Sequence, residues 1–268
     1  MVNMYLSSSI ILRNDLFRIR KIIEESNLLI IGDKVESLYV ALNSVKLNRQ
    51  ILKDYIFKHP EYLYSLEQVK VTESAPRLVK MAASASEVVN VGPMAAIPGA
   101  LAEIAVEEML SQGGLVNIAE NGGEIAASSN KPLIIGIYAG KTPFSGRVGL
   151  QLSENDFPIG VATSSATVSH AINFGEADAV VIISNSAAYS DAIATAVSNI
   201  VRGPDIEASV QSGLELVEKI PSIRSAIIIR GKYVGKIGRL PKLVKLKGEQ
   251  NDMFKASIYD IYQDSIVL

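Results

Sequence analysis

An aspartate and a threonine stand four residues apart in an alanine-rich segment. Asp191 and Thr195 lie in the run SDAIATAVSN, and the sequence predicts a helix over 187–202. Residues four apart share one face of a helix, with Cβ atoms about 5 to 6 Å apart. A carboxylate and a hydroxyl so placed can hold one cation, and the alanines between them would let a bulky ligand approach. The simpler interpretation is an aspartate that caps a helix, with alanines packed on a sheet.

A glycine turn offers a second group of ligand contacts. In Glu120-Asn-Gly-Gly-Glu124, the glycines Gly122 and Gly123 expose backbone N–H groups beside the amide of Asn121. Such a turn can approach a ribose or a heterocycle closely. The simpler interpretation is a hairpin turn between two strands.

A hydroxyl cluster offers a third group. Thr163, Ser164 and Ser165 follow an apolar run and precede a helix predicted over 164–172. Free N–H groups and the dipole at a helix N-terminus favour phosphate oxygens. The simpler interpretation is an N-cap with spare hydroxyls. His170 in this segment is the candidate proton carrier, although a lone histidine is more often structural.

Composition limits the chemistry that these residues can support. The 268 residues include no cysteine and only two histidines, His59 and His170, so thiolate zinc sites and three-histidine metal centres are excluded. Any metal must be held by oxygen ligands, which suits Mg²⁺ shared with a substrate phosphate. With 26 basic and 28 acidic residues, the chain is not expected to bind nucleic acid.

Two familiar catalytic patterns are rejected. The segment from Gly136 to Thr142 resembles a phosphate-binding Walker loop, but it has three residues between its glycines instead of four and no helix signal after it. We expect a loop between two strands there. No Gly-x-Ser-x-Gly sequence is present, so a serine hydrolase is not expected.

The pattern of elements favours an α+β fold with mixed or antiparallel sheets. Further helices are predicted over 35–57, where the apolar spacing falls into two pieces, and over 76–89, 98–111 and 206–219. Strands are predicted at 17–21, 28–31, 115–119, 124–128, 132–139, 146–152, 157–163, 178–184, 225–230 and 232–237.

Residues 1–245 are expected to form one domain that starts with a hairpin and a helix, followed by a tail over 246–268. A short echo between Gly99-Ala-Leu-Ala-Glu103 and Asp191-Ala-Ile-Ala-Thr195 hints at internal duplication. No segment approaches the roughly 20 apolar residues of a membrane helix, and no signal peptide is visible, so a cytoplasmic protein without membrane contact is expected. Whether the chain forms a homo-oligomer is left open.

Four runs of the sequence occur together in order: VGPMAAIPGALAE (91–103), ENGGEI (120–125), GVATSSATVSHAINFGEADAVVI (160–182) and SDAIATAVSN (190–199). They resemble the ApbE-like superfamily, the FAD:protein FMN transferases, and within it the UPF branch, whose function is unassigned. The similarity extends from about Phe17 to Val244. The resemblance therefore implies an ApbE-like fold over nearly the whole chain.

The resemblance also implies a ligand and a metal site. In the transferases that this chain resembles, an Asp-Ala-x-Ala-Thr helix and a backbone carbonyl of a Gly-Ala-x-Ala stretch hold Mg²⁺ beside the FAD pyrophosphate, and FMN passes to a threonine of a protein acceptor. Asp191 and Thr195 match the helix. Gly99, Ala100 and Ala102 match the stretch; we take the Ala102 carbonyl as the metal ligand, although the match alone does not fix which carbonyl serves. Mg²⁺ neutralises charge on a phosphoryl group without cysteine or histidine.

Two departures from the transferase pattern leave the activity open. Glu103 stands where the transferases usually carry lysine, and Asn173 stands where they carry a carboxylate after the histidine. One hypothesis is therefore an Mg²⁺-dependent enzyme that transfers FMN or a nucleotide, or cleaves a pyrophosphate. The alternative is a non-catalytic carrier or sensor that binds a flavin nucleotide or a similar phosphate-bearing small molecule.

Overall fold

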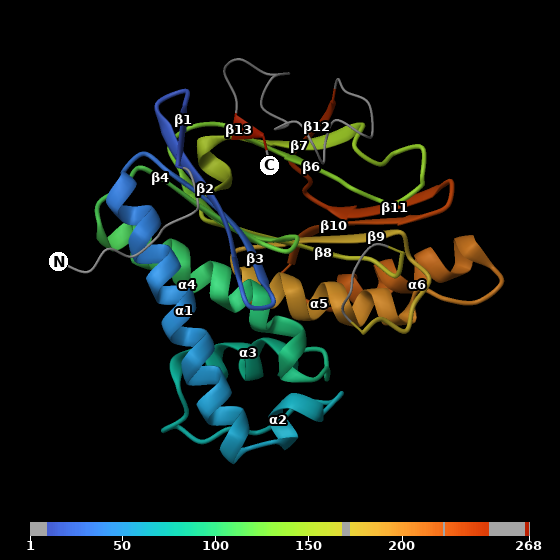
Figure 1. The fold of residues 1–268 in the computed structure, drawn as a ribbon. Helices are drawn as coiled ribbons and strands as arrows, with labels where there is room; N and C mark the ends of the chain where they lie inside the picture. The colour runs from blue at the N-terminus through green and yellow to red at the C-terminus, as the bar shows by residue number, and fades with distance from the viewer. Residues whose placement is uncertain (1–9, 168–171, 222, 247–265, 268) are drawn as a thin grey trace.

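A nine-stranded antiparallel sheet, sheet A, is the scaffold of the fold (Figure 1). The computed structural model describes residues 10–167, 172–221, 223–246 and 266–267. The strand order of sheet A within these residues is β1-β2-β3-β4-β5-β8-β9-β10-β11. The strands are β1 (Ile11–Arg13), β2 (Leu16–Ile23), β3 (Ser26–Gly32), β4 (Val116–Asn121), β5 (Glu124–Ser129), β8 (Ile159–Ser164), β9 (Ala179–Ser184), β10 (Ile223–Arg230) and β11 (Tyr233–Gly238).

A smaller sheet, sheet B, lies over one face of sheet A (Figure 1). Its strand order in the described part of the chain is β12-β7-β6-β13. These strands are β6 (Leu133–Gly136), β7 (Val148–Leu152), β12 (Lys242–Lys245) and β13 (Ile266–Val267), and β13 pairs with β6 in parallel. Large aliphatic side chains such as Ile31, Ile118, Leu133 and Leu150 fill the space between the two sheets and are fully buried.

The helices cover the opposite face of sheet A (Figure 1). They are α1 (Val35–Lys58), α2 (Glu61–Tyr64), α3 (Arg77–Glu87), α4 (Ile97–Ser111), α5 (Ala187–Ile200) and α6 (Ile206–Glu218), with short 3₁₀ helices η1 (Pro93–Ala96) and η2 (Glu154–Asp156). The helix side of the core is rich in alanine, including Ala100, Ala105, Ala192 and Ala196. Small side chains let helix backbones approach the sheet and each other closely.

The α+β class, the antiparallel sheets and the main elements are confirmed. The hairpin β2–β3, the hairpin β4–β5 and the helices α1, α3, α4, α5 and α6 fall where hydrophobic spacing predicts them. Pro76 is the N-cap of α3. The loop from Ile137 to Arg147 joins β6 to β7, as expected from the rejected Walker pattern.

Three expectations need correction. Residues 164–172 were expected to be helical, but Ser164 ends β8 and the residues to Thr167 form a turn, while 168–171 lie outside the described residues. Helix α1 is one continuous helix of 24 residues, although its apolar spacing suggests two pieces. The central residues of the β4–β5 turn are Gly122 and Gly123, because Asn121 pairs with Glu124.

A bilayer-spanning helix is absent from the described residues, since none of their helices has both the length and the apolar character that a crossing requires.

Candidate functional site

The first turns of α4 and α5 meet at Gly99. A Cβ atom at Gly99 would lie 2.3 Å from the carbonyl oxygen of Ala187 and 2.9 Å from the Cβ of Asp191. Both distances are shorter than normal contacts, so only glycine lets the two helices come this close. The glycine of the Gly-Ala-Leu-Ala stretch therefore places the start of α4 directly against the residues expected to bind a ligand.

Each of these helices carries a carboxylate that caps the other. The Gly99 N–H donates to Oδ2 of Asp191 at 2.8 Å. The hydroxyl of Ser186 and the N–H of Ala188 donate to Oε2 of Glu103 at 2.6 and 3.2 Å. Helix N-termini expose unpaired N–H groups, and Ala96 at the N-cap of α4 has no side-chain oxygen that could accept from them. Asp191 therefore has the capping role of the simpler interpretation, but from a neighbouring helix.

The β4–β5 turn lies beside this junction. Gly122 and Gly123 have φ angles of 73° and 121°, which glycine adopts without strain. The amide of Asn121 donates to the carbonyl of Pro98, the residue before Gly99, at 3.1 Å. The N–H of Gly123 donates to Oε1 of Glu120 at 3.0 Å. Asn121 thus ties the tip of the hairpin to the N-terminus of α4.

The end of β8 lies across the sheet from the same turn. A Cβ atom at Gly123 would lie 3.8 Å from the carbonyl oxygen of Thr163. The hydroxyl of Ser164 accepts from the amide of Asn173 at 3.1 Å, and the same amide donates to the hydroxyl of Ser198 on α5 at 2.8 Å. The hydroxyl of Ser164 therefore lies on the helix side near α5, without forming a helix N-terminus. Strand alternation puts the side chain of Thr163 on the other face, with Val161 between the sheets.

Ser165 does not share that position. Its hydroxyl accepts from the N–H of Thr167 at 3.2 Å, and the N–H of Ala166 donates to the carbonyl of Ala177 at 2.9 Å. These bonds close a local turn that leads the chain towards β9, which explains why the predicted helix does not start here. His170 lies outside the described residues.

Two buried carboxylates, Asp191 and Glu124, interact through their charges at this end of sheet A. Asp191 is 7% exposed and Glu124 is 9% exposed. Burial raises the pKa of Asp191 to about 8, against the opposing effect of the Gly99 hydrogen bond. Burial, followed by the negative charges of Asp191 and Glu120, raises the pKa of Glu124 well above its usual range. A positive charge placed between these two groups would be strongly favoured.

The donor set suits a hard cation that shares its ligands with another molecule. Within the residues that the structure describes, no three His, Cys, Asp or Glu side chains come together as a metal centre. Thr195, half-buried, follows Asp191 by one turn of α5, and Ala100 and Ala102 are buried in the first turns of α4. Carboxylate and hydroxyl oxygens completed by phosphate oxygens are typical of Mg²⁺ sites.

Comparison with known proteins gives the family. A family model described as "AbpE bacteria" matches residues 11–216. The UPF0280 protein of Methanocaldococcus jannaschii is 39% identical over 248 residues, which cover 92% of this chain and 99% of that protein. The UPF0280 protein of Methanopyrus kandleri is 37% identical over 236 residues, which cover 87% and 95%. The chain belongs to the ApbE-like UPF0280 family.

Solved structures show the same fold at low identity. The ApbE protein of Thermotoga maritima aligns with a TM-score of 0.56 and 13% identity, covering 90% of this chain and 100% of that chain. The flavinyl transferase ApbE of Pseudomonas stutzeri, in its apo form, aligns with a TM-score of 0.54 and 14% identity, covering 88% and 95%. The ApbE-like fold is therefore confirmed for this UPF0280 chain.

Sequence reasoning missed the position of Glu124 and the partners of Glu103. Side chains alternate along a strand, so Ile125 and Ala127 between the sheets put Glu124 on the helix side. That alternation was a usable signal. The carboxylate of Glu103 was expected to face an anionic ligand, but its Oε2 caps α5 instead. Only the tertiary structure shows that Glu103 on α4 caps α5.

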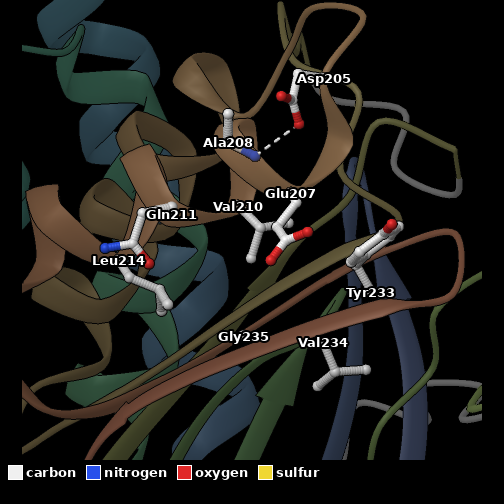
Figure 2. A pocket seen from close by; sticks show the side chains of 9 residues that line it. All are labelled: Asp205, Glu207, Ala208, Val210, Gln211, Leu214, Tyr233, Val234 and Gly235. Atoms are coloured by element: carbon white, nitrogen blue, oxygen red, sulfur yellow. Dashed lines mark hydrogen bonds between the residues drawn. The ribbon is translucent and has the colours of Figure 1, made fainter.

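A groove of about 500 Å³ on another part of the molecule contains none of the predicted site residues. It lies between α6 and β11, where Val210 and Leu214 line it together with Tyr233 and Val234 (Figure 2). Asp205 at its upper end accepts from the N–H of Ala208 at 3.0 Å and caps α6. Its acidic residues serve a helix or face solvent, and we assign no ligand to it.

Proposed function

We propose that this protein binds a flavin nucleotide together with Mg²⁺ and acts on its pyrophosphate. The observation that carries the proposal is the buried Asp191 at the junction of α4 and α5. One of its oxygens accepts the Gly99 N–H, and among the described residues the other has no hydrogen-bond donor. Burial disfavours the charged form of this carboxylate, and a bound cation would offset that cost.

The residues that would hold the cation are Asp191, Thr195 and the carbonyl of Ala102. When bound, Mg²⁺ would neutralise the charge of a phosphoryl group and stabilise the leaving nucleotide. The lack of side chains at Gly122 and Gly123 would let the ligand approach the turn, with Gly99, Ala100 and Asn121 beside it. The N–H groups of Gly99, Gly122 and Gly123 themselves donate within the chain, to Asp191, Asn27 and Glu120. Of the hydroxyl cluster, Ser164 is the proposed contact for phosphate oxygens. Thr163 lies on the face towards sheet B, and the hydroxyl of Ser165 accepts within a local turn.

The proposed reaction breaks the bridging P–O bond of FAD. A hydroxyl oxygen attacks the phosphorus of the FMN half, AMP leaves with the bonding electron pair, and the hydroxyl proton passes to a base, for which His170 is proposed. With a threonine of a protein acceptor as the nucleophile, the products are FMN esterified to that protein and AMP. With water, the products are FMN and AMP. The fold shared with a flavinyl transferase supports this choice of ligand.

The second candidate function is a flavin carrier without turnover. Asn173 favours it, because its amide joins Ser164 to Ser198 and supplies no carboxylate for proton transfer. Glu103 favours neither candidate function, since its carboxylate accepts a hydrogen bond from Ser186 at the N-terminus of α5.

Incubation with FAD and Mg²⁺ separates the two candidates. With water as the nucleophile, chromatography should show FMN and AMP in equal amounts with the native chain, and neither product with Asp191→Asn. FAD that stays bound and intact in the presence of Mg²⁺ would favour the carrier. Failure to bind FAD with or without Mg²⁺ would contradict both, and mass spectrometry of ligands that copurify would then test for another phosphorylated metabolite.

A further inference from the structure

Glu124 is a buried carboxylate that the proposed site does not yet use. It opens β5 and pairs with Asn121 across the glycine turn. With 9% exposure it is more than nine-tenths buried. In the described part of the chain, its carboxylate accepts a hydrogen bond only from its own backbone N–H. No arginine, lysine or neighbouring N–H in that part compensates its charge.

The position of Glu124 directs it towards the α4–α5 junction. Strand alternation puts it on the helix side of sheet A, the same side as Asn121. Asn121 bonds to Pro98, and the next residue, Gly99, bonds to Asp191. The hairpin tip, the N-terminus of α4 and Asp191 are thus joined by direct contacts. These contacts put Glu124 and Asp191 on the same side of sheet A at the same end of the junction, and the negative charge of Asp191 contributes to the raised pKa of Glu124.

Two buried carboxylates close to one another can be stabilised in two ways. They can share a proton, or they can share a divalent cation whose charge they balance. The half-buried hydroxyl of Thr195 lies one turn from Asp191 on α5. Hard oxygen donors of this kind prefer Mg²⁺ or Mn²⁺ over softer metals.

We propose that Glu124 is a second carboxylate ligand of the divalent cation held by Asp191, so that the cation binds before any nucleotide arrives. This inference rests on the cation site of the proposed function and adds a ligand to it. Two carboxylates neutralise a divalent ion without help from phosphate. A site with both carboxylates should therefore bind the metal in the absence of nucleotide, whereas a site with Asp191 alone would need the nucleotide.

The probe is Mn²⁺ without nucleotide. Binding is measured as the loss of the electron paramagnetic resonance signal of free Mn²⁺ when the full chain is added. The native protein should bind one Mn²⁺. Glu124→Gln and Asp191→Asn should each raise the Kd for Mn²⁺ about tenfold or more. Glu207→Gln is the control: it removes an exposed carboxylate from the groove between α6 and β11, which contains none of the site residues, and the Kd should change less than about twofold.

The outcomes separate the inference from the proposed function. A Kd unchanged in Glu124→Gln but raised in Asp191→Asn would overturn the role of Glu124 and keep the cation site. A native protein that binds Mn²⁺ only when FAD is present would also overturn it. A Kd unchanged in both variants would remove the cation site itself. Circular dichroism checks folding, and Glu124→Asp, which keeps the charge but shortens the reach, replaces any variant that fails to fold.

Discussion

The two faces of sheet A differ in what they bury. The face towards sheet B is packed with large aliphatic side chains, including Ile118 and Leu150, which are fully buried. The face towards the helices combines large aliphatic side chains such as Ile30 with alanines and, at one end, holds Glu124 near Asp191 of α5. Both faces gain free energy from apolar burial, but the helix side gives up some of it to bury charge. The difference teaches that the buried charge of the candidate site is confined to one of the two layers.

The largest expected effect on folding lies between the sheets. Leu150→Ala should lower the free energy of unfolding by about 2 to 5 kcal/mol, because it removes a fully buried side chain and leaves a cavity. Urea denaturation measures this loss. Leu243→Ala is the matched control, since Leu243 pairs with Leu150 across the strands but is 45% exposed. Equal losses in the two variants would show that burial between the sheets does not account for the contribution of Leu150.

A smaller loss is expected at the contact between the helices. Gly99→Ala favours a helix intrinsically, but its Cβ would lie 2.3 Å from the carbonyl oxygen of Ala187. We expect a destabilisation of about 1 to 3 kcal/mol as α4 and α5 move apart. Thermal and urea unfolding provide the measurement. Glu108→Ala, on the same helix and half-buried, should change stability by less than about 0.5 kcal/mol. A stabilised Gly99→Ala variant would show that the contact is not tight.

The last expected effect is a gradual dependence of stability on pH. The pKa of Asp191 is about 8 in the folded chain and 3.8 as the reference value, so between these pH values the folded state holds a proton that the unfolded state has lost. Stability of the metal-free protein should therefore fall as pH rises from about 4 to 8. Urea midpoints across this range test the slope, which Asp191→Asn should reduce. A slope that is unaltered in the variant would assign the effect to other groups.

Much of the fold was predictable because its signals are local. Apolar spacing and glycine or proline boundaries give α4, α5 and the β4–β5 hairpin within a few residues. The helix expected over 164–172 was wrong where the structure describes it, because the hydroxyl of Ser165 bonds to the Thr167 N–H and closes a turn. A hydroxyl-rich segment favours a cap and a turn equally, and the sequence does not decide between them.

The structure brings several of the predicted site residues together, but the sequence did not show how they contact one another. Asp191 was identified by its spacing from Thr195, and the structure adds the bond to Gly99 that joins two helices. The echo between the two alanine-rich segments suggested that Gly99 corresponds to Asp191. The contacts instead put Gly99 against Ala187, and the two helices exchange caps through Glu103 and Asp191. Such exchange depends on tertiary packing, which spacing along one chain does not encode.

The most direct test of the central claim is the affinity for FAD measured by flavin fluorescence with Mg²⁺ and with a chelator. If Asp191 holds a cation beside the ligand, Mg²⁺ should tighten FAD binding to the native chain by about tenfold or more, and Asp191→Asn should abolish this gain while circular dichroism stays unchanged. An equal gain from Mg²⁺ in the native chain and in Asp191→Asn would contradict the account.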